Sequence, residues 1–171
     1  MSLTAARYAS ALYQAGCTED ELRDTAQLIL ENKPLLEALV SPAVRLEEKQ
    51  AVLRRLPFAS CPDRLMHFYE LLAKKGRFAL LADIVSEYHL LTLAAANQTV
   101  CVMRCAQMPD EAMVVDIAKA MCRRHGRAGV EMQVIVDPSL VGGFVLEIDG
   151  TTYNKSVSGQ LHRLARRLQE R

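Results

Sequence analysis

The stretch that decides the fold is residues 136–150, which read VDPSLVGGFVLEIDG. It is dense in backbone signals and poor in reactive side chains. Gly142-Gly143 allows a positive φ or the close approach of a second backbone segment. Asp149-Gly150 is a strong signal for a two-residue hairpin turn. We therefore interpret the stretch as a structural signature, in which these four residues shape the backbone, and not as an active site.

Strands and a closing helix are predicted on either side of this signature. Apolar and polar residues alternate from Val130 to Val136, which is the period of a half-buried strand, and Asp137-Pro138 ends it. From Phe144 to Ile148 the same alternation predicts a second strand with one apolar face. Ser156 is placed to cap a last helix. The apolar stripe of that helix consists of Val157, Leu161, Leu164 and Leu168.

A change of pattern along the chain predicts two domains. The chain has 171 residues, half of them hydrophobic, which is enough to bury one sizeable core or two small ones. Residues 1–97 read as helical throughout, whereas residues 98–171 alternate strand and helix. We predict a mainly α protein, with an N-terminal six-helix bundle in residues 1–97 and a small α/β domain in residues 98–171.

Six short helices with small connections suit an antiparallel bundle. Gly16 ends the first helix, and Thr18 with Glu21 forms a capping box for the second. The first two predicted helices cover about residues 4–15 and 18–32, and the third opens at Pro34. The fourth follows Ser41-Pro42, the fifth follows Ser60, and the sixth runs from Arg77 to about Ala95.

The first predicted helix has more apolar surface than one core direction requires. Its polar residues fall on one narrow stripe, namely Thr4, Arg7, Ser10 and Gln14. Ala5, Ala9 and Leu12 make its inward face, and Tyr8, Ala11 and Ala15 extend the apolar surface round one flank. Leu71 likewise lies off the apolar stripe of the fifth helix. Two interpretations stay open: a groove that receives a partner helix, or a central helix that its own bundle wraps on all sides.

Charge limits the classes of function. The 21 basic and 20 acidic residues leave a net charge of +1, whereas a nucleic-acid platform needs a denser basic surface. The one basic cluster follows the last helix and consists of His162, Arg163, Arg166, Arg167 and Arg171. It is either a solvated face or a contact for a partner or an anionic lipid.

Membrane and targeting signals are weak. The longest apolar run that we identify, Leu90 to Ala96, is far shorter than the roughly 20 residues that cross a bilayer. The N-terminus has neither the charged start nor the apolar stretch of a signal peptide. We expect a soluble protein that stays in the cytoplasm and reaches a membrane only through a partner.

No motif carries enzymatic chemistry. Cys101 and Cys105 have no matching Cys or His pair at metal-ligand spacing. Gly142-Gly143 is followed by a predicted strand and not by the helix N-terminus that binds phosphate. We expect no catalytic residue, metal, cofactor or small-molecule substrate. The cysteines are odd in number and scattered, which indicates small buried hydrophobes: Cys17, Cys61, Cys101, Cys105 and Cys122.

Together with Tyr153, Ser156 and Gln160-Leu161, the stretch 136–150 resembles the C-terminal signature of the delta subunit of F-type ATP synthases, the oligomycin-sensitivity-conferring protein of mitochondria. Residues 6–13, ARYASALY, are similar to the opening helix of that family. Residues 74–77, KKGR, are similar to its mid-chain helix junction. The resemblance covers nearly the whole chain.

The resemblance implies a non-catalytic stator subunit of a proton-driven ATP synthase. In this family the first and fifth helices form a groove for the N-terminal helix of one alpha subunit, which makes Tyr8, Ala11 and Leu71 the candidate partner-binding residues. The C-terminal domain contacts the b subunits of the peripheral stalk. The expected location is the cytoplasmic face of the cell membrane, where the protein would be peripheral through the complex. No nucleic acid and no direct membrane insertion are expected.

Two positions depart from the family pattern. Asn154-Lys155 stands where an aspartate-glycine pair is usual, and Ser158 replaces a basic residue. The competing hypothesis is a freestanding nucleic-acid-binding or regulatory adaptor that uses the α/β half. Its predicted strands lack the interleaved aromatic residues that stack on bases, and a salt-dependent affinity for RNA or DNA would support it.

Overall fold

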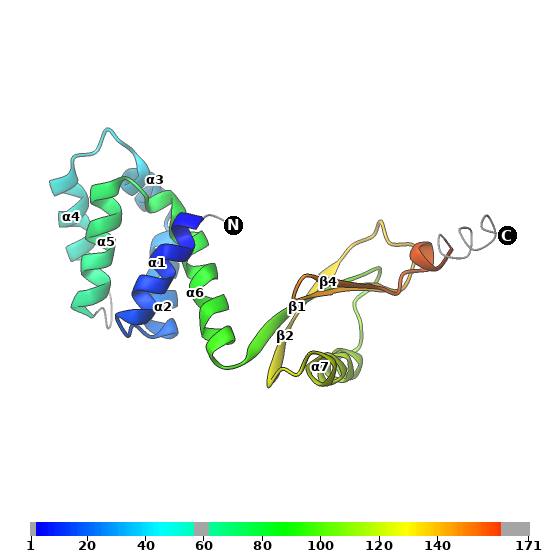
Figure 1. Cartoon of the computed structure of the whole chain (residues 1–171). Helices are drawn as coiled ribbons and strands as arrows, with labels where there is room; N and C mark the ends of the chain where they lie inside the picture. Colours follow the sequence, from blue (N-terminus) through cyan, green and yellow to red (C-terminus); the bar gives the residue numbers. More distant parts are fainter. Residues whose placement is uncertain (1–2, 57–61, 162–171) are drawn as a thin grey trace. The chain divides into compact units, whose positions relative to one another are not determined.

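The structure is a computed structural model that describes residues 3–56 and 62–161. The chain divides into two compact units, Met1–Thr92 and Leu93–Arg171 (Figure 1). This division precedes the domain boundary that we predicted after residue 97. The basic cluster at 162–171 and the helix positions Leu164 and Leu168 lie outside the described residues, as do Ser60 and Cys61.

The first unit is helical. Its elements are α1 (Leu3–Gln14), α2 (Glu19–Glu31), α3 (Lys33–Val40), α4 (Leu46–Arg55), α5 (Asp63–Lys75), the short 3-10 helix η1 (Phe78–Leu80) and α6 (Leu81–Ala95). The fourth helix begins later than predicted, at Leu46, because the chain makes a turn and a bend after Pro42. The antiparallel six-helix bundle stays a prediction.

Local signals place the helix ends. Thr18 Oγ1 accepts the backbone N–H of Glu21, and the Glu21 carboxylate accepts the backbone N–H of Thr18, so the predicted capping box is confirmed. Gly76 adopts the left-handed conformation, with φ 62°, and ends α5. These caps satisfy backbone groups that the start of α2 and the end of α5 would otherwise leave without intrahelical partners.

One hydrophobic core joins the helices of this unit, and α5 supplies a large share of it. Leu65, Tyr69 and Leu72 of α5 are fully buried. The Tyr69 hydroxyl lies 2.6 Å from Thr25 Oγ1 on α2, so its polar end is satisfied inside the core. The Tyr88 hydroxyl of α6 donates to the carbonyl of Cys17. The inward face predicted for the first helix is confirmed by the buried residues Ala5, Ala9 and Leu12.

The second unit packs one helix on a four-stranded mixed sheet. Its elements are β1 (Gln98–Cys105), α7 (Glu111–His125), β2 (Gly129–Val136), β3 (Phe144–Ile148) and β4 (Thr151–Asn154). The strand order is β2-β1-β3-β4; β1 and β2 are parallel and the other pairs antiparallel. The helix α7 connects the two parallel strands and packs against the sheet (Figure 1).

The core of this unit lies on one face of the sheet. Cys101 pairs with Met132 on β2 and with Ile148 on β3, so alternate residues of three strands point the same way. Cys101, Met103 and Cys105 are buried there, and Ile117 and Met121 of α7 pack against them. Two of the predicted buried cysteines therefore belong to the sheet core.

Gly143 allows two segments of backbone to meet. It has φ 78°, and an added Cβ would overlap the carbonyl oxygen of Lys155 and lie 3.0 Å from Cα of Ser156. Two backbone hydrogen bonds fasten the segments on either side, from Lys155 N to Phe144 O at 2.9 Å and from Val157 N to Gly142 O at 3.0 Å. The close approach that we predicted for Gly142-Gly143 is therefore present.

The turn between β3 and β4 has the predicted two-residue form. Asp149 and Gly150 both have positive φ, 47° and 72°, and Ile148 pairs with Thr151. The Asp149 carboxylate accepts hydrogen bonds from Thr99 Oγ1 at 2.8 Å and from Arg127 Nε at 3.1 Å. His125 Nδ1 lies 3.5 Å from the same carboxylate. The turn thus connects the start of β1, the end of α7 and the loop before β2.

Ser156 caps the helical residues 157–161 as predicted, because its Oγ accepts the backbone N–H of Gly159 at 3.1 Å. Asn154 Oδ1 in turn accepts the backbone N–H and the hydroxyl of Ser156, at 2.9 and 2.7 Å. The Asn154 side chain therefore holds the capping serine in place.

Substitution of Gly143 tests the close approach. Gly143→Ala should destabilise the protein by about 2 to 4 kcal/mol, because it adds a steric overlap to the cost of a positive φ. Gly150→Ala is the matched control, since Gly150 has φ 72° with open space around the Cβ position; it should cost only about 1 kcal/mol. Urea unfolding followed by circular dichroism measures both. Equal losses would contradict the close packing of Gly143.

The pH dependence of stability tests the Asp149 contacts. The hydrogen bond from Thr99 is the largest cause that lowers the pKa of Asp149, and Arg127 and His125 add to it, while partial burial opposes them. A lowered carboxylate pKa stabilises the fold above the unfolded-state pKa, and this contribution disappears as the pH falls through the folded-state value. Asp149→Asn should therefore lower Tm by roughly 5 to 10 °C at pH 7.

The difference in Tm should begin to shrink as the pH falls below about 4, the ordinary aspartate value, and should close only below the lowered folded-state pKa of Asp149. Asp116→Asn, a position on α7 away from the turn, is the control and should leave the pH profile unchanged. A gap between wild type and Asp149→Asn that stays constant down to about pH 3 would contradict the ionic contribution.

Candidate partner-binding surfaces

The helices α1 and α5 lie side by side and run in opposite directions, as three contacts along their length show. At the end of α1, the carbonyl of Ala15 accepts Arg64 Nη1 at 3.2 Å. Further toward its start, Tyr8 packs edge-on against Phe68, with ring centroids 6.1 Å apart. Tyr8 OH also accepts Arg77 Nη1 at 3.1 Å, from just beyond the end of α5.

The predicted partner-binding residues border this seam. Tyr8 is half-buried, Ala11 and Ala15 are exposed, and Leu71 is 42 % exposed. At about 100° per residue, Leu71 falls on the same flank of α5 as Phe68 and Arg64, which both contact α1. We call Tyr8, Ala11, Ala15, Phe68 and Leu71 the α1–α5 surface.

Within the described residues the helical unit leaves this flank of α1 open. The exposure of Ala11 and Ala15 disagrees with the interpretation of a central helix that is wrapped on all sides. Of the two interpretations, the burial of the side chains favours an apolar surface of small residues with one aromatic ring. Whether a partner occupies it remains a prediction.

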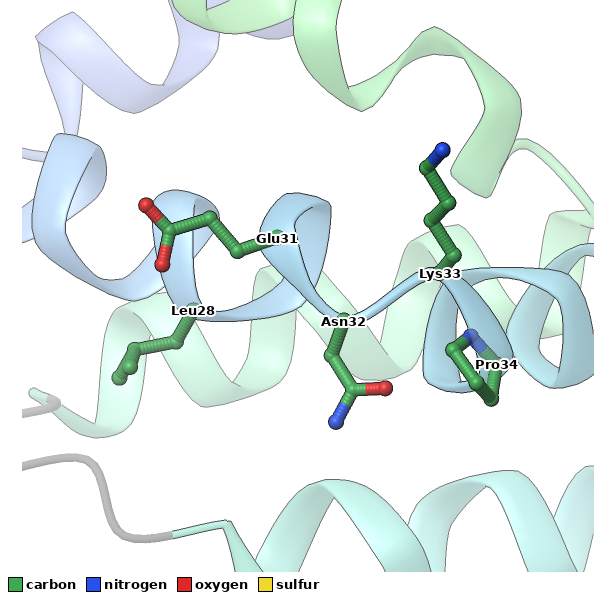
Figure 2. Close-up of a pocket in the computed structure, with 5 residues that line it drawn as sticks. All are labelled: Leu28, Glu31, Asn32, Lys33 and Pro34. Atoms are coloured by element: carbon green, nitrogen blue, oxygen red, sulfur yellow. The ribbon is translucent and has the colours of Figure 1, made fainter.

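A hollow of the helical unit lies at the junction of α2 and α3 and measures about 520 Å³ (Figure 2). Figure 2 shows that Glu31 and Lys33 point away from Leu28, Asn32 and Pro34, so the polar groups do not converge on one point. Asn32 Oδ1 accepts the backbone N–H of Leu35 and caps α3. We interpret this hollow as a consequence of the helix junction and not as a ligand site.

The second unit has an apolar pocket of about 480 Å³ beside the glycine pair. It is lined by Met103 and Cys105 of β1, by Met113 of α7, and by Val141 and Gly143 of the loop between β2 and β3. Val141 is 85 % exposed, and the neighbouring Met108 is 73 % exposed. Exposed methionines adapt to varied partner shapes. The sequence pointed to Gly142-Gly143 but not to these apolar residues, which are scattered over three elements.

One expectation about membrane segments needs correction. The helical stretch Phe78–Ala95, which includes α6, is long and apolar enough to cross a membrane by length and composition. The prediction from apolar runs covered only its last residues, because Asp83 and Glu87 interrupt the run. Its buried side chains, Leu81, Ile84 and Tyr88, belong to the core of the helical unit. A single helix of this kind is weak support for a membrane span.

Several titratable side chains of the described residues are engaged in local contacts. His89 Nδ1 lies 2.6 Å from a Glu19 carboxylate oxygen, and His125 Nε2 lies 3.0 Å from the hydroxyl of Tyr153. Burial is the largest cause that raises the pKa of the Cys17 and Cys101 thiols, which makes them poor nucleophiles. In the described ranges no group of three or more His, Cys, Asp or Glu residues could hold a metal ion.

The comparisons with known proteins agree over nearly the whole chain. The family model described as ATP synthase delta (OSCP) subunit matches residues 4–168. The ATP synthase subunit delta of Geobacillus sp. (strain WCH70) is 28 % identical over 173 residues, covering 97 % of this chain and 97 % of that protein. The protein of the same name from Bacillus thuringiensis (strain Al Hakam) is 27 % identical and covers 97 % and 96 %.

The fold is also similar to a solved structure. A chain of the Toxoplasma gondii mitochondrial ATP synthase hexamer matches with a TM-score of 0.72 and 18 % identity, over 99 % of this chain and 98 % of that one. At 18 % sequence identity, this structural match shows that the fold is similar and no more. The family model, which spans both units, decides the assignment: the chain belongs to the ATP synthase delta (OSCP) subunit family.

Proposed function

We propose that this protein is a stator subunit that links the catalytic head of an F-type ATP synthase to its peripheral stalk. Rotation of the central stalk exerts a reaction torque on the head, and a link of this kind stops the head from turning with the rotor. The protein itself would be non-catalytic. It would lie at the cytoplasmic face of the cell membrane, held there through the complex, and serve proton-driven ATP synthesis.

The observation that carries this proposal is the α1–α5 surface. We propose that it receives the N-terminal helix of one alpha subunit, with the helical unit acting as a six-helix bundle. Small residues such as Ala11 and Ala15 let a helix approach closely, while Tyr8 and Leu71 offer larger apolar contacts. A partner helix laid along this seam would bury the exposed part of Leu71.

The apolar pocket of the second unit is our candidate for the contact with the peripheral stalk. We propose that the b subunits of the peripheral stalk bind there, against Met103, Met113 and Val141. The nearby exposed residues Val157 and Leu161 extend the apolar surface. The backbone contact between Gly143 and Lys155 holds the loop that carries Val141 against the start of the last helix.

Such a link must resist a steady load, and slow dissociation matters more than fast association. Burial of apolar side chains at the centre of an interface contributes more to slow dissociation than exposed ion pairs do. Both proposed surfaces are mainly apolar, which agrees with this requirement.

Titration of the full chain with a synthetic peptide tests the first contact. The peptide should comprise the N-terminal segment of the alpha subunit from the same organism, and isothermal calorimetry should report one-to-one binding. Absence of binding by a folded protein would contradict the proposed function and direct attention to the nucleic-acid alternative.

Leu71→Asp should weaken binding of this peptide by about 30-fold or more, because it places a charge where the partner helix should be apolar. The fold should remain intact, since Leu71 is already 42 % exposed. Leu28→Asp is the matched control: Leu28, on α2, is 44 % exposed and lies away from the α1–α5 surface. Calorimetry measures binding and circular dichroism measures folding.

Equal weakening by Leu28→Asp and Leu71→Asp would show that the effect is not local. Unfolding of Leu71→Asp would show that Leu71 is a core residue, and the assignment of the α1–α5 surface would then be wrong.

A further inference from the structure

The end of the α1–α5 surface near Tyr8 is strongly basic. Lys74 and Lys75 close the last turn of α5, and Arg77 follows after Gly76. Arg77 is held against Tyr8: its Nη1 donates to the tyrosine hydroxyl at 3.1 Å, and its guanidinium carbon lies 6.0 Å from the ring centroid. The contact fixes a positive charge at the border of an apolar surface.

Among the described residues, no acidic side chain of α1 or of the facing flank of α5 balances this charge. The only charged residue in the sequence of positions 1–18 is Arg7. On α5, the flank that faces α1 carries Arg64 and Lys75 beside Phe68 and Leu71. Glu70 points the other way, because its carboxylate pairs with Arg54 of α4 at 2.8 Å. Asp63 lies in the first turn of α5, at the opposite end from Lys75.

The two ends of the surface therefore differ in charge. Near the end of α1, Arg64 has an acidic neighbour, since it contributes to lowering the pKa of Glu21, behind the larger effect of the hydrogen bonds with Thr18. Near Tyr8, Lys75 and Arg77 have no acidic neighbour among the described residues of α1 or of the facing flank of α5, while Lys74, four residues after Glu70, lies on the flank of that glutamate. A partner helix that lies on this surface meets uncompensated positive charge at one end only.

We propose that this basic end, formed by Lys74, Lys75 and Arg77, selects and orients a partner helix that carries carboxylates beside its apolar stripe. The apolar residues provide burial, and the basic end determines which amphipathic helix is accepted and in which direction it lies. Charges at the rim of an interface act mainly on the association rate and on discrimination between partners. This inference rests on the proposed function and adds the chemistry of the partner.

The test uses the alpha-subunit peptide and a second peptide in which each Asp and Glu is replaced by Gln or Asn. Lys74→Glu/Lys75→Glu should weaken binding of the native peptide by roughly tenfold at low ionic strength. The weakening should fall below about threefold in about 0.5 M salt, where exposed charges are screened. Lys33→Glu/Arg55→Glu makes the same change in net charge on other exposed helices and should change affinity less than about twofold.

A charge exchange completes the experiment. A peptide whose carboxylates are replaced by Lys should bind Lys74→Glu/Lys75→Glu more tightly than it binds the wild type. If the native peptide binds the wild type and both double variants equally, or if its neutral version binds as tightly, the charge selection is overturned and the proposed function stands. If the native peptide does not bind the folded wild type at all, both are overturned.

Discussion

The packing of Tyr69 is the interaction on which the helical unit and its proposed binding surface depend. This side chain is fully buried, meets Thr25 of α2 through its hydroxyl and stacks against Phe78 of η1 at 6.3 Å between ring centroids. It thereby fixes the rotation of α5 about its own axis. Because Leu71 lies two residues further along the helix, the same rotation turns Leu71 toward solvent, beside the contacts of α5 with α1.

Much of the fold could be predicted because its signals are local. The capping box of Thr18 and Glu21, the turn at Asp149-Gly150 and the serine cap at Ser156 each involve residues within a few positions of one another. The alternation in β3 and the inward face of α1 also follow directly from the sequence. Gly143 was recognisable as special, although its contact with Lys155 was not, since that contact joins segments twelve residues apart.

The remaining features depend on side chains that meet over long distances in sequence. Nothing in the sequence pairs Tyr8 with Arg77 or Thr99 with Asp149, because these contacts exist only after the helices and strands have packed. The fourth helix begins later than expected, at Leu46, because Pro42 and Ala43 form a turn and do not open the helix. The apolar pocket went unrecognised because Met103, Met113 and Val141 come from three separate elements.

The most direct test of the stator role is reconstitution of coupling in membrane vesicles whose ATP synthase lacks only this subunit. We predict that such vesicles synthesise no ATP from an imposed proton gradient, and that adding the purified full chain restores both retention of the catalytic head and ATP synthesis. Undiminished synthesis without the chain, or head retention that does not respond to its addition, would contradict the claim that this protein holds the head to the stalk.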